Sequence, residues 1–253
     1  NTAPTTTATA GSLAYTENAA ATVIDSGITV TDPDNNWSTG TLKAQITANP
    51  TAADTLTVGN VGTVTVSGLN VSVSAVLKGT LSAASVTNGT ALTVTFNASA
   101  TSADVQAVAR AFQYLNSSDA PSTTARTVTF TVTDSVSTTG SSTRGIAVTA
   151  VNDAPITNLP GILSVNEDGS AFLAAGSVQD ADSGAGNLTL SFAVPAGTLT
   201  ITGNANVAVV GSPGTSITAS GTAANLNSWL AGGNVVSYAP AANSTTGVTM
   251  TES

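Results

Sequence analysis

Carboxylates are the only side chains of this sequence whose types and spacing suggest a site for chemistry. The chain has fourteen Asp and Glu residues against five Lys and Arg. Ten of the acids fall in short repeated motifs or in their counterparts: Glu17, Asp32, Asp34, Asp134, Asp153, Glu167, Asp168, Asp180, Asp182 and Glu252. They collect at the ends of strand-like runs and between the two halves of the chain, with almost no basic residue nearby. We therefore expect them to hold a cation.

The cation that this residue set predicts is calcium. Calcium takes about six to eight oxygen ligands from carboxylates, Asn side chains and backbone carbonyls. The chain has neither His nor Cys, which leaves zinc without its usual donors. Asp32 and Asp34 are two residues apart, as are Asp180 and Asp182, so each pair projects to one side of an extended loop and can share an ion. The competing interpretation is that these acids form only solvated turns.

Enzymatic function finds no support in the residue types. There is no His for proton transfer and no Cys nucleophile, and no base accompanies the abundant Ser and Thr. The glycines are dispersed at turns instead of forming a phosphate-binding loop. The net charge of −9 argues against nucleic acid as a partner. No run approaches the roughly 20 apolar residues of a membrane span, so we expect no direct membrane insertion.

The pattern of apolar residues predicts an all-β fold. They alternate with Thr at a period of two, as in residues 128–132, which places them on one buried face of a strand. Gly, Asn and Pro separate such runs. The predicted strands are 21–31, 42–47, 55–58, 61–66, 71–77, 92–96, 127–133 and 145–151. Each half of the chain is therefore expected to be a β-sandwich.

Each half also contains one segment with helical spacing. Residues 101–110 form the first, with Thr101 or Ser102 as its cap, and residues 222–230 form the second, with Thr222 as its cap. The aromatic residues of these helices and of the strands after them are expected in the core: Phe112, Tyr114, Trp229 and Tyr238. Trp37 follows a polar turn, so we expect it to be exposed, where it could contact a sugar or cover one end of the sandwich.

Four features recur in the same order, which indicates an internal repeat. The most informative is Asn1-Thr2-Ala3-Pro4, which returns as Asn152-Asp153-Ala154-Pro155. We predict two domains, residues 1–151 and 152–253. The second lacks the last strand of the first, because residues 248–253 align with 130–135. We favour a fragment of a longer array as the explanation, with a strand donated by a neighbouring chain as the alternative.

The acidic motifs resemble those of cadherins and of bacterial cadherin-like tandem repeats. The matching segments are Thr16-Glu17-Asn18, Thr31-Asp32-Pro33-Asp34, Thr133-Asp134 and Val151-Asn152-Asp153-Ala154-Pro155. The resemblance covers both repeats and implies two tandem cadherin-like or immunoglobulin-like β-sandwiches. It also implies calcium sites shared between consecutive repeats.

The resemblance assigns ligands residue by residue. The junction site would use Glu17, Asn152, Asp153, Asp180, Asp182 and Glu252. A second site, shared with an upstream repeat, would use Asp32, Asp34 and Asp134, and Glu167 and Asp168 would need a downstream repeat. Asn1-Thr2 departs from the Asn-Asp pattern of the family and removes one carboxylate. No clear counterpart of the acidic triplet in the middle of many cadherin domains is found, which implies fewer ions per junction.

These observations predict a calcium-rigidified, non-catalytic segment of a bacterial adhesin or surface stalk. Its partners would be neighbouring repeats of the same protein, and its location extracellular or at the cell surface. The first alternative is a self-assembling subunit of an extracellular filament, sheath or surface layer. The second is a carbohydrate-binding module, for which only Trp37 offers an aromatic platform.

Overall fold

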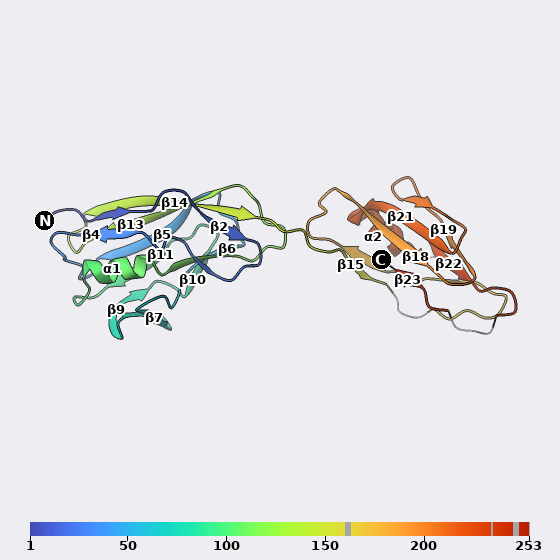
Figure 1. Ribbon diagram of the computed structural model, residues 1–253, viewed down its shortest axis with the longest axis horizontal. Helices are drawn as coiled ribbons and strands as arrows, with labels where there is room; N and C mark the ends of the chain where they lie inside the picture. The colour runs from blue at the N-terminus through green and yellow to red at the C-terminus, as the bar shows by residue number, and fades with distance from the viewer. Residues whose placement is uncertain (160–162, 234, 245–247, 253) are drawn as a thin grey trace. The chain divides into compact units, whose positions relative to one another are not determined.

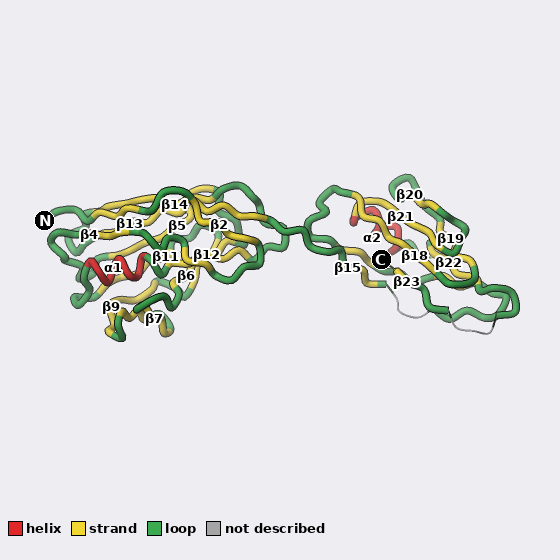
Figure 2. Tube along the Cα trace, in the orientation of Figure 1, coloured by secondary structure: helices red, strands yellow, loops and turns green. Residues whose placement is uncertain are grey.

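The protein is all-β apart from two short helices, and its chain divides into two compact units (Figures 1 and 2). The structure is a computed structural model that describes residues 1–159, 163–233, 235–244 and 248–252. Unit 1 is Asn1–Val151 and unit 2 is Asn152–Ser253. The repeated Asn-x-Ala-Pro motif stands at the start of each unit.

Unit 1 contains a large sheet, a smaller sheet and a strand pair. The large sheet has the order β2 (Ser12–Thr16), β14 (Thr139–Thr149), β13 (Arg126–Thr133), β5 (Thr41–Ala48), β11 (Leu92–Phe96), β9 (Val76–Leu81), β8 (Asn70–Val73) and β7 (Val64–Ser67). The smaller sheet has the order β10 (Ser85–Thr87), β6 (Asp54–Val58), β12 (Phe112–Asn116) and β3 (Thr22–Val23). The pair consists of β1 (Thr5–Thr7) and β4 (Thr29–Thr31). Neighbouring strands run antiparallel except β14 and β2, which are parallel.

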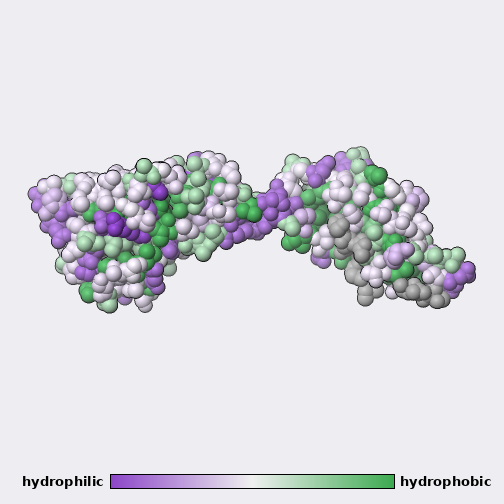
Figure 3. All heavy atoms as spheres, in the orientation of Figure 1, coloured by the Kyte–Doolittle hydropathy of each residue, from purple (hydrophilic) through white to green (hydrophobic). Residues whose placement is uncertain are grey.

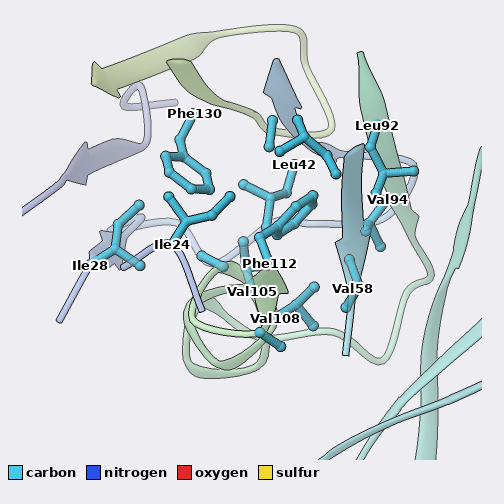
Figure 4. Close-up of a cluster of buried hydrophobic side chains, with 14 of the residues drawn as sticks. Ile24, Ile28, Leu42, Val58, Leu92, Val94, Val105, Val108, Phe112 and Phe130 are labelled. Carbon is cyan, nitrogen blue, oxygen red and sulfur yellow. The ribbon is translucent and has the colours of Figure 1, made fainter. Parts of the chain in front are cut away.

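The core of unit 1 lies between the faces of these sheets, as the two-residue period predicts. In β13 every second residue is buried, and the side chains of Val128, Phe130 and Val132 are fully buried. Thr residues occupy the alternate positions at the other face. Phe112 from the smaller sheet packs edge-to-face on Phe130, with ring centroids 5.9 Å apart. Figure 4 shows these rings among the aliphatic side chains of the core.

Helix α1 (Ser102–Ala109) covers this core next to β4. Its N-cap is Thr101, whose hydroxyl accepts a hydrogen bond from the N–H of Asp104, while the Asp104 carboxylate accepts one from the N–H of Thr101. This reciprocal capping box satisfies two of the free donors at a helix N-terminus. Val105 and Val108 are buried and lie close to Phe112 in Figure 4. The helix predicted over residues 101–110 is confirmed.

Unit 2 is built from two sheets, a strand pair and helix α2 (Ala223–Ala231). One sheet has the order β20 (Ala208–Val210), β21 (Ser216–Thr222), β18 (Asn187–Ala193) and β23 (Thr251–Glu252). The other has the order β16 (Ala171–Phe172), β22 (Val236–Ala239) and β19 (Thr198–Ile201), and the pair is β15 (Ile156–Asn158) with β17 (Ser177–Gln179). Helix α2 is capped by Thr222 and ends at Gly232, so this prediction is also confirmed.

The two units share an arrangement of strands. The order β13-β5-β11-β9 in unit 1 corresponds to β23-β18-β21-β20 in unit 2, and β6-β12-β3 corresponds to β19-β22-β16. In both units the helix joins the third strand of the first set to the middle strand of the second. In the described part of unit 2, β23 pairs with β18 alone, whereas β13 pairs with both β5 and β14.

Three predicted strands are wrong in detail. Of residues 61–66, the first three precede β7, which begins only at Val64. Residues 21–31 form β3 and β4, because Ile24 to Gly27 make a turn in which the Asp25 carboxylate accepts from the N–H of Gly27. Residues 71–77 contain the turn between β8 and β9, where Ser74 and Ala75 both take positive φ, at 50° and 64°. Neither residue is a usual one for that conformation, so the hairpin gives no turn signal in the sequence.

Candidate metal centre

Glu17 is the acid of unit 1 whose surroundings most clearly fit a cation. It follows β2, and its N–H donates to the carbonyl of Thr149 at the end of β14 (2.9 Å). Its carboxylate turns back toward the same strand end, where Oε2 accepts from the N–H of Val151 (2.7 Å). The residue is only 5 % exposed. Because β2 pairs in parallel with β14, Glu17 lies next to Val151, the last residue of unit 1.

The second oxygen of Glu17 is buried without a partner. Among the residues that the structure describes, none donates a hydrogen bond to Oε1. A buried carboxylate oxygen left unpaired is costly, and most such groups in proteins are satisfied by a donor, a water or an ion. The described salt bridges are Lys78–Asp104 and Arg126–Asp54, so no basic side chain of the described chain neutralises Glu17.

Asp119 brings a second carboxylate to this place. It is exposed on the loop of residues 117–125, between β12 and β13, and its ligand oxygen lies within 4.8 Å of that of Glu17. Two acids at this separation repel each other unless a cation lies between them. Oxygen ligands of this kind suit a hard divalent ion such as calcium. The pair of Glu17 and Asp119 could therefore hold a metal ion.

In unit 2 the structure brings together three of the acids that the sequence predicts as ligands. The N–H of Asp153 donates to Oδ2 of Asp182 (2.5 Å). Oδ1 of Asp180 accepts from the N–H groups of Asp182 (2.9 Å) and Ser183 (3.0 Å). Asn152 donates from its side-chain Nδ2 to the carbonyl of Asp153 (2.8 Å). These contacts fix the loop of Asp180 and Asp182 to the start of the unit.

The same arrangement recurs at the start of unit 1. The N–H of Thr2 donates to Oδ2 of Asp34 (2.5 Å), in the way that Asp153 donates to Asp182. Asp32 is buried, and its two oxygens accept from the N–H groups of Asp34 and Asn36, each at 3.1 Å. On the face shown in Figure 3, strongly hydrophilic residues gather at this end of unit 1.

Asp134 lies beside these residues with both carboxylate oxygens already occupied. Oδ1 accepts from the N–H groups of Val136 (3.0 Å) and Thr138 (2.9 Å). Oδ2 accepts from Nδ2 of Asn1 (2.8 Å) and from the hydroxyl of Thr138. Desolvation opposes ionisation, but these hydrogen bonds outweigh it and lower the pKa of Asp134 to about 2. A cation bound to Asp134 would have to displace the Asn1 or Thr138 donor.

The remaining predicted ligands are less completely placed. Glu252 lies in β23, and its backbone pairs with Phe192 of β18, but its side chain is outside the described part of the structure. Glu167 is exposed, and Asp168 accepts from the N–H of Asn243 at the long distance of 3.4 Å.

Asp119 is the residue that the sequence-based assignment missed. It stands five residues after Tyr114, in a loop that has no acidic motif of its own. Asn243 stands at the same distance from Tyr238, so the position carries an oxygen-bearing side chain in both repeats. That recurrence is the signal that could have found it.

Trp37 was expected to be exposed, and this prediction is wrong. Its side chain is 1 % exposed, packs edge-to-face with Phe96 at 6.2 Å between ring centroids, and donates from Nε1 to the hydroxyl of Ser102 (3.0 Å). A Trp that fills the core offers no stacking platform, so the carbohydrate-binding alternative loses its one candidate residue. The core positions predicted for Phe112, Tyr114, Trp229 and Tyr238 are confirmed.

The chain matches no protein-family model and no curated protein. Within the described residues, neither helix has the length and apolar character that crossing a membrane requires.

Proposed function

We propose that this chain is a non-catalytic segment of an extracellular adhesin or surface stalk whose linker is stiffened by calcium. The observation that carries the proposal is the buried Glu17 carboxylate, with one oxygen on the N–H of Val151 and the other free beside Asp119. Val151 is the last residue of unit 1, so this carboxylate lies where the chain passes from one unit to the next.

A cation between Glu17 and Asp119 would act on the linker through Val151, whose N–H donates to the Glu17 carboxylate. One ion with ligands from Glu17 and Asp119 would cross-link β2 and the loop of residues 117–125, and it would hold the carboxylate that fixes the start of the linker. Without the ion the same carboxylates repel one another, and the linker is free to move. Calcium would thus convert a flexible joint into a stiff one.

The first experiment measures calcium binding to the full chain by titration calorimetry. We expect a dissociation constant on the order of 10⁻⁴ to 10⁻³ M, the range of extracellular calcium modules. Asp119→Asn keeps the side-chain shape and removes one charge, and it should weaken binding at least about 10-fold. Asp104→Asn is the matched control, because Asp104 serves the α1 capping box and the salt bridge to Lys78. It should leave calcium affinity unchanged.

Small-angle scattering then tests the mechanical part. The parent chain should show a narrower distribution of dimensions with calcium than with a chelator, and Asp119→Asn should show the broad distribution in both. Equal scattering of the parent under the two conditions would exclude stiffening. Absence of binding in the parent would reduce these acids to turn residues.

Self-assembly into a filament, sheath or surface layer remains the second candidate, supported by one edge of unit 1. Strand β7 ends the large sheet and carries no charged residue or proline, the usual protections of an exposed edge. Three large apolar side chains are also exposed here: Leu69, directly before β8, and Val76 and Leu77, the first two residues of β9. Sedimentation velocity at high protein concentration should show ordered multimers under this hypothesis, and a monomer would count against it.

A further inference from the structure

Asp119 needs support to act as a ligand. It lies on a loop of residues 117–125 without regular secondary structure, composed of Ser, Thr, Ala, Pro and Asp119 itself. A side chain on a free loop must be ordered when an ion binds, and that loss of conformational freedom weakens binding. The position of Asp119 within 4.8 Å of Glu17 therefore depends on what holds this loop.

A buried polar network lies beneath the loop, centred on Asp54. Asp54, Tyr114, Asn116 and Arg126 are each at most 1 % exposed. Oδ1 of Asp54 accepts from the Tyr114 hydroxyl (2.5 Å) and from Nδ2 of Asn116 (2.7 Å). Oδ2 accepts from the N–H of Thr51 (2.7 Å) and pairs with Nε of Arg126 (3.3 Å). Asn116 and Arg126 are the residues at which β12 ends and β13 begins.

The same two residues hold the loop on either side of Asp119. The side-chain oxygen of Asn116 accepts from the N–H of Ser118 (3.0 Å), directly before Asp119. Nη1 of Arg126 donates to the carbonyls of Ser122 and Thr124, the latter at 2.8 Å. The buried network thus anchors the loop backbone before and after the acid.

The strand that carries Glu17 is connected to this network as well. The hydroxyl of Tyr15, in β2, donates to the carbonyl of Ala19 (2.6 Å) and accepts from the N–H of Asn116 (3.3 Å). The Tyr15 ring also packs edge-to-face on Tyr114, with centroids 4.9 Å apart. The strand before Glu17 and the loop of Asp119 are therefore both held by the buried network centred on Asp54.

We infer that Arg126, Asp54 and Asn116 are positioning residues that preorganise Asp119 for the cation it shares with Glu17; this rests on the calcium function proposed above. A buried ion pair is weak evidence for stability, since apolar residues of similar volume often stabilise a core equally well. The pair here also leaves Nη2 of Arg126 buried without a partner among the described residues. What it provides is a rigid guanidinium that pairs with Asp54 through Nε while Nη1 donates to two loop carbonyls.

The test is Arg126→Lys in the full chain. Lysine keeps the positive charge, but its single ammonium group cannot pair with Asp54 and also reach the carbonyls of Ser122 and Thr124 as two separate guanidinium nitrogens do. We expect its calcium dissociation constant to rise about 10-fold, as for supporting residues of other metal sites. Arg144→Lys is the matched control, because Nη1 of Arg144 donates to the carbonyls of Thr9 (2.7 Å) and Ala10 (2.5 Å) in another loop. It should leave the calcium affinity unchanged.

Unfolding in chelator separates positioning from stability. An Arg126→Lys chain that is less stable but binds calcium like the parent would overturn the inference. If Arg126→Lys does not fold, Ser118→Gly replaces it: this change removes the hydroxyl that accepts from the N–H of Ala120 (3.2 Å) and loosens the residue before Asp119. It should also weaken binding, and unchanged affinity would again overturn the inference.

The outcomes also distinguish the two proposals. If the parent binds calcium and Asp119→Asn binds weakly, but Arg126→Lys and Ser118→Gly bind like the parent, only the positioning role fails. If the parent binds no calcium, the function and the positioning role fail together.

Discussion

The buried carboxylates of unit 1 differ in how many hydrogen bonds their oxygens accept. This difference distinguishes the acids with a structural role from the one that could bind an ion. Asp25 is 2 % exposed, and its oxygens accept from the N–H and hydroxyl of Thr9 (both 2.8 Å) and from the N–H of Gly27 (3.0 Å). Asp54 is similarly saturated by its buried network. Glu17 alone among these three keeps a buried oxygen without a described partner. The hydrogen bonds of Asp25 and Asp54 stabilise the surrounding backbone and side chains, whereas the unpaired oxygen of Glu17 could bind an ion.

Asp54 should make the stability of unit 1 sensitive to acid. Burial raises its pKa, but hydrogen bonds from Tyr114, Asn116 and Thr51 and the charge of Arg126 outweigh this and lower the pKa below 3.8. Because the pKa is lower in the folded state, the ionised Asp54 carboxylate contributes to the free energy of unfolding above pH 3.8. This contribution is lost as the pH falls from 3.8 through the pKa of the folded state. Urea unfolding measured from pH 6 downward should show this loss.

The control for this prediction is Asp54→Asn, which removes the titrating group. It leaves Arg126 buried without its counter-charge, so the free energy of unfolding at neutral pH should fall by about 3 to 5 kcal/mol. Between neutral pH and pH 3 its stability should decline less than that of the parent. If the free energy of unfolding of the variant and of the parent fell equally with pH, acids other than Asp54 would be responsible for the loss of stability.

At the scale of elements, each helix is joined to the strand beside it by one amide side chain. In unit 1, Gln106 of α1 accepts from the N–H of Val30 in β4 (3.2 Å). In unit 2, Asn227 of α2 accepts from the N–H of Val178 in β17 (2.7 Å) and donates to its carbonyl (2.8 Å). Both backbone groups of the central residue of β17 are thus paired by the helix. We therefore expect the stability of unit 2 to depend more on Asn227 than the stability of unit 1 depends on Gln106.

Asn227→Ala should therefore destabilise its unit more than Gln106→Ala destabilises the other. Losing both bonds leaves a donor and an acceptor of Val178 unpaired, which should cost about 1 to 3 kcal/mol. Amide hydrogen exchange should show a larger loss of protection at Val178 than at Val30. Equal losses at the two amides would contradict this ranking.

The elements were predictable where the signal is local. The alternation of apolar residues and Thr in residues 128–132 predicted which face of β13 is buried. The capping residues Thr101 and Thr222 predicted where the two helices begin. Ser74 and Ala75 form a turn that their residue types do not announce. Trp37 follows polar residues, yet tertiary packing against Phe96 buries it.

The candidate site was predictable only in part, because it depends on contacts between distant segments. Glu17 was identified from its motif, but its burial comes from pairing of β2 with β14. Asp119 lies 102 positions further along the chain, and only the fold brings the two carboxylates together. No periodicity or spacing encodes such a pair.

At the scale of the whole molecule, charge is divided unequally between the units. All five basic residues belong to unit 1: Lys43, Lys78, Arg110, Arg126 and Arg144. Unit 2 has no basic residue, and its acids are all motif residues: Asp153, Glu167, Asp168, Asp180, Asp182 and Glu252. Unit 1 can neutralise some of its acids internally, as in Arg126–Asp54, whereas unit 2 has no basic side chain that could do so.

Calcium bound by Glu17 and Asp119 should stabilise unit 1, to which both residues belong. Any ion that binds the folded state alone raises its stability by mass action. Replacing chelator with calcium should increase the amide protection of β5 and β13, in the core of unit 1, more than that of β18 and β21 in unit 2. Sodium chloride at matched ionic strength is the control, because it screens charge without occupying a site. An equal gain from both salts would indicate screening alone.

The burial of Trp37 and Trp229 gives the protein one intrinsic optical reporter in each unit. These are the only two tryptophans, and they are 1 % and 4 % exposed. Unfolding of a unit transfers its indole from the core to water, which shifts the fluorescence emission to longer wavelength. Trp37→Phe leaves a chain whose tryptophan emission reports on unit 2, and Trp229→Phe leaves one that reports on unit 1. The melting of each half can thus be followed in the intact chain, without separating the units or attaching a dye.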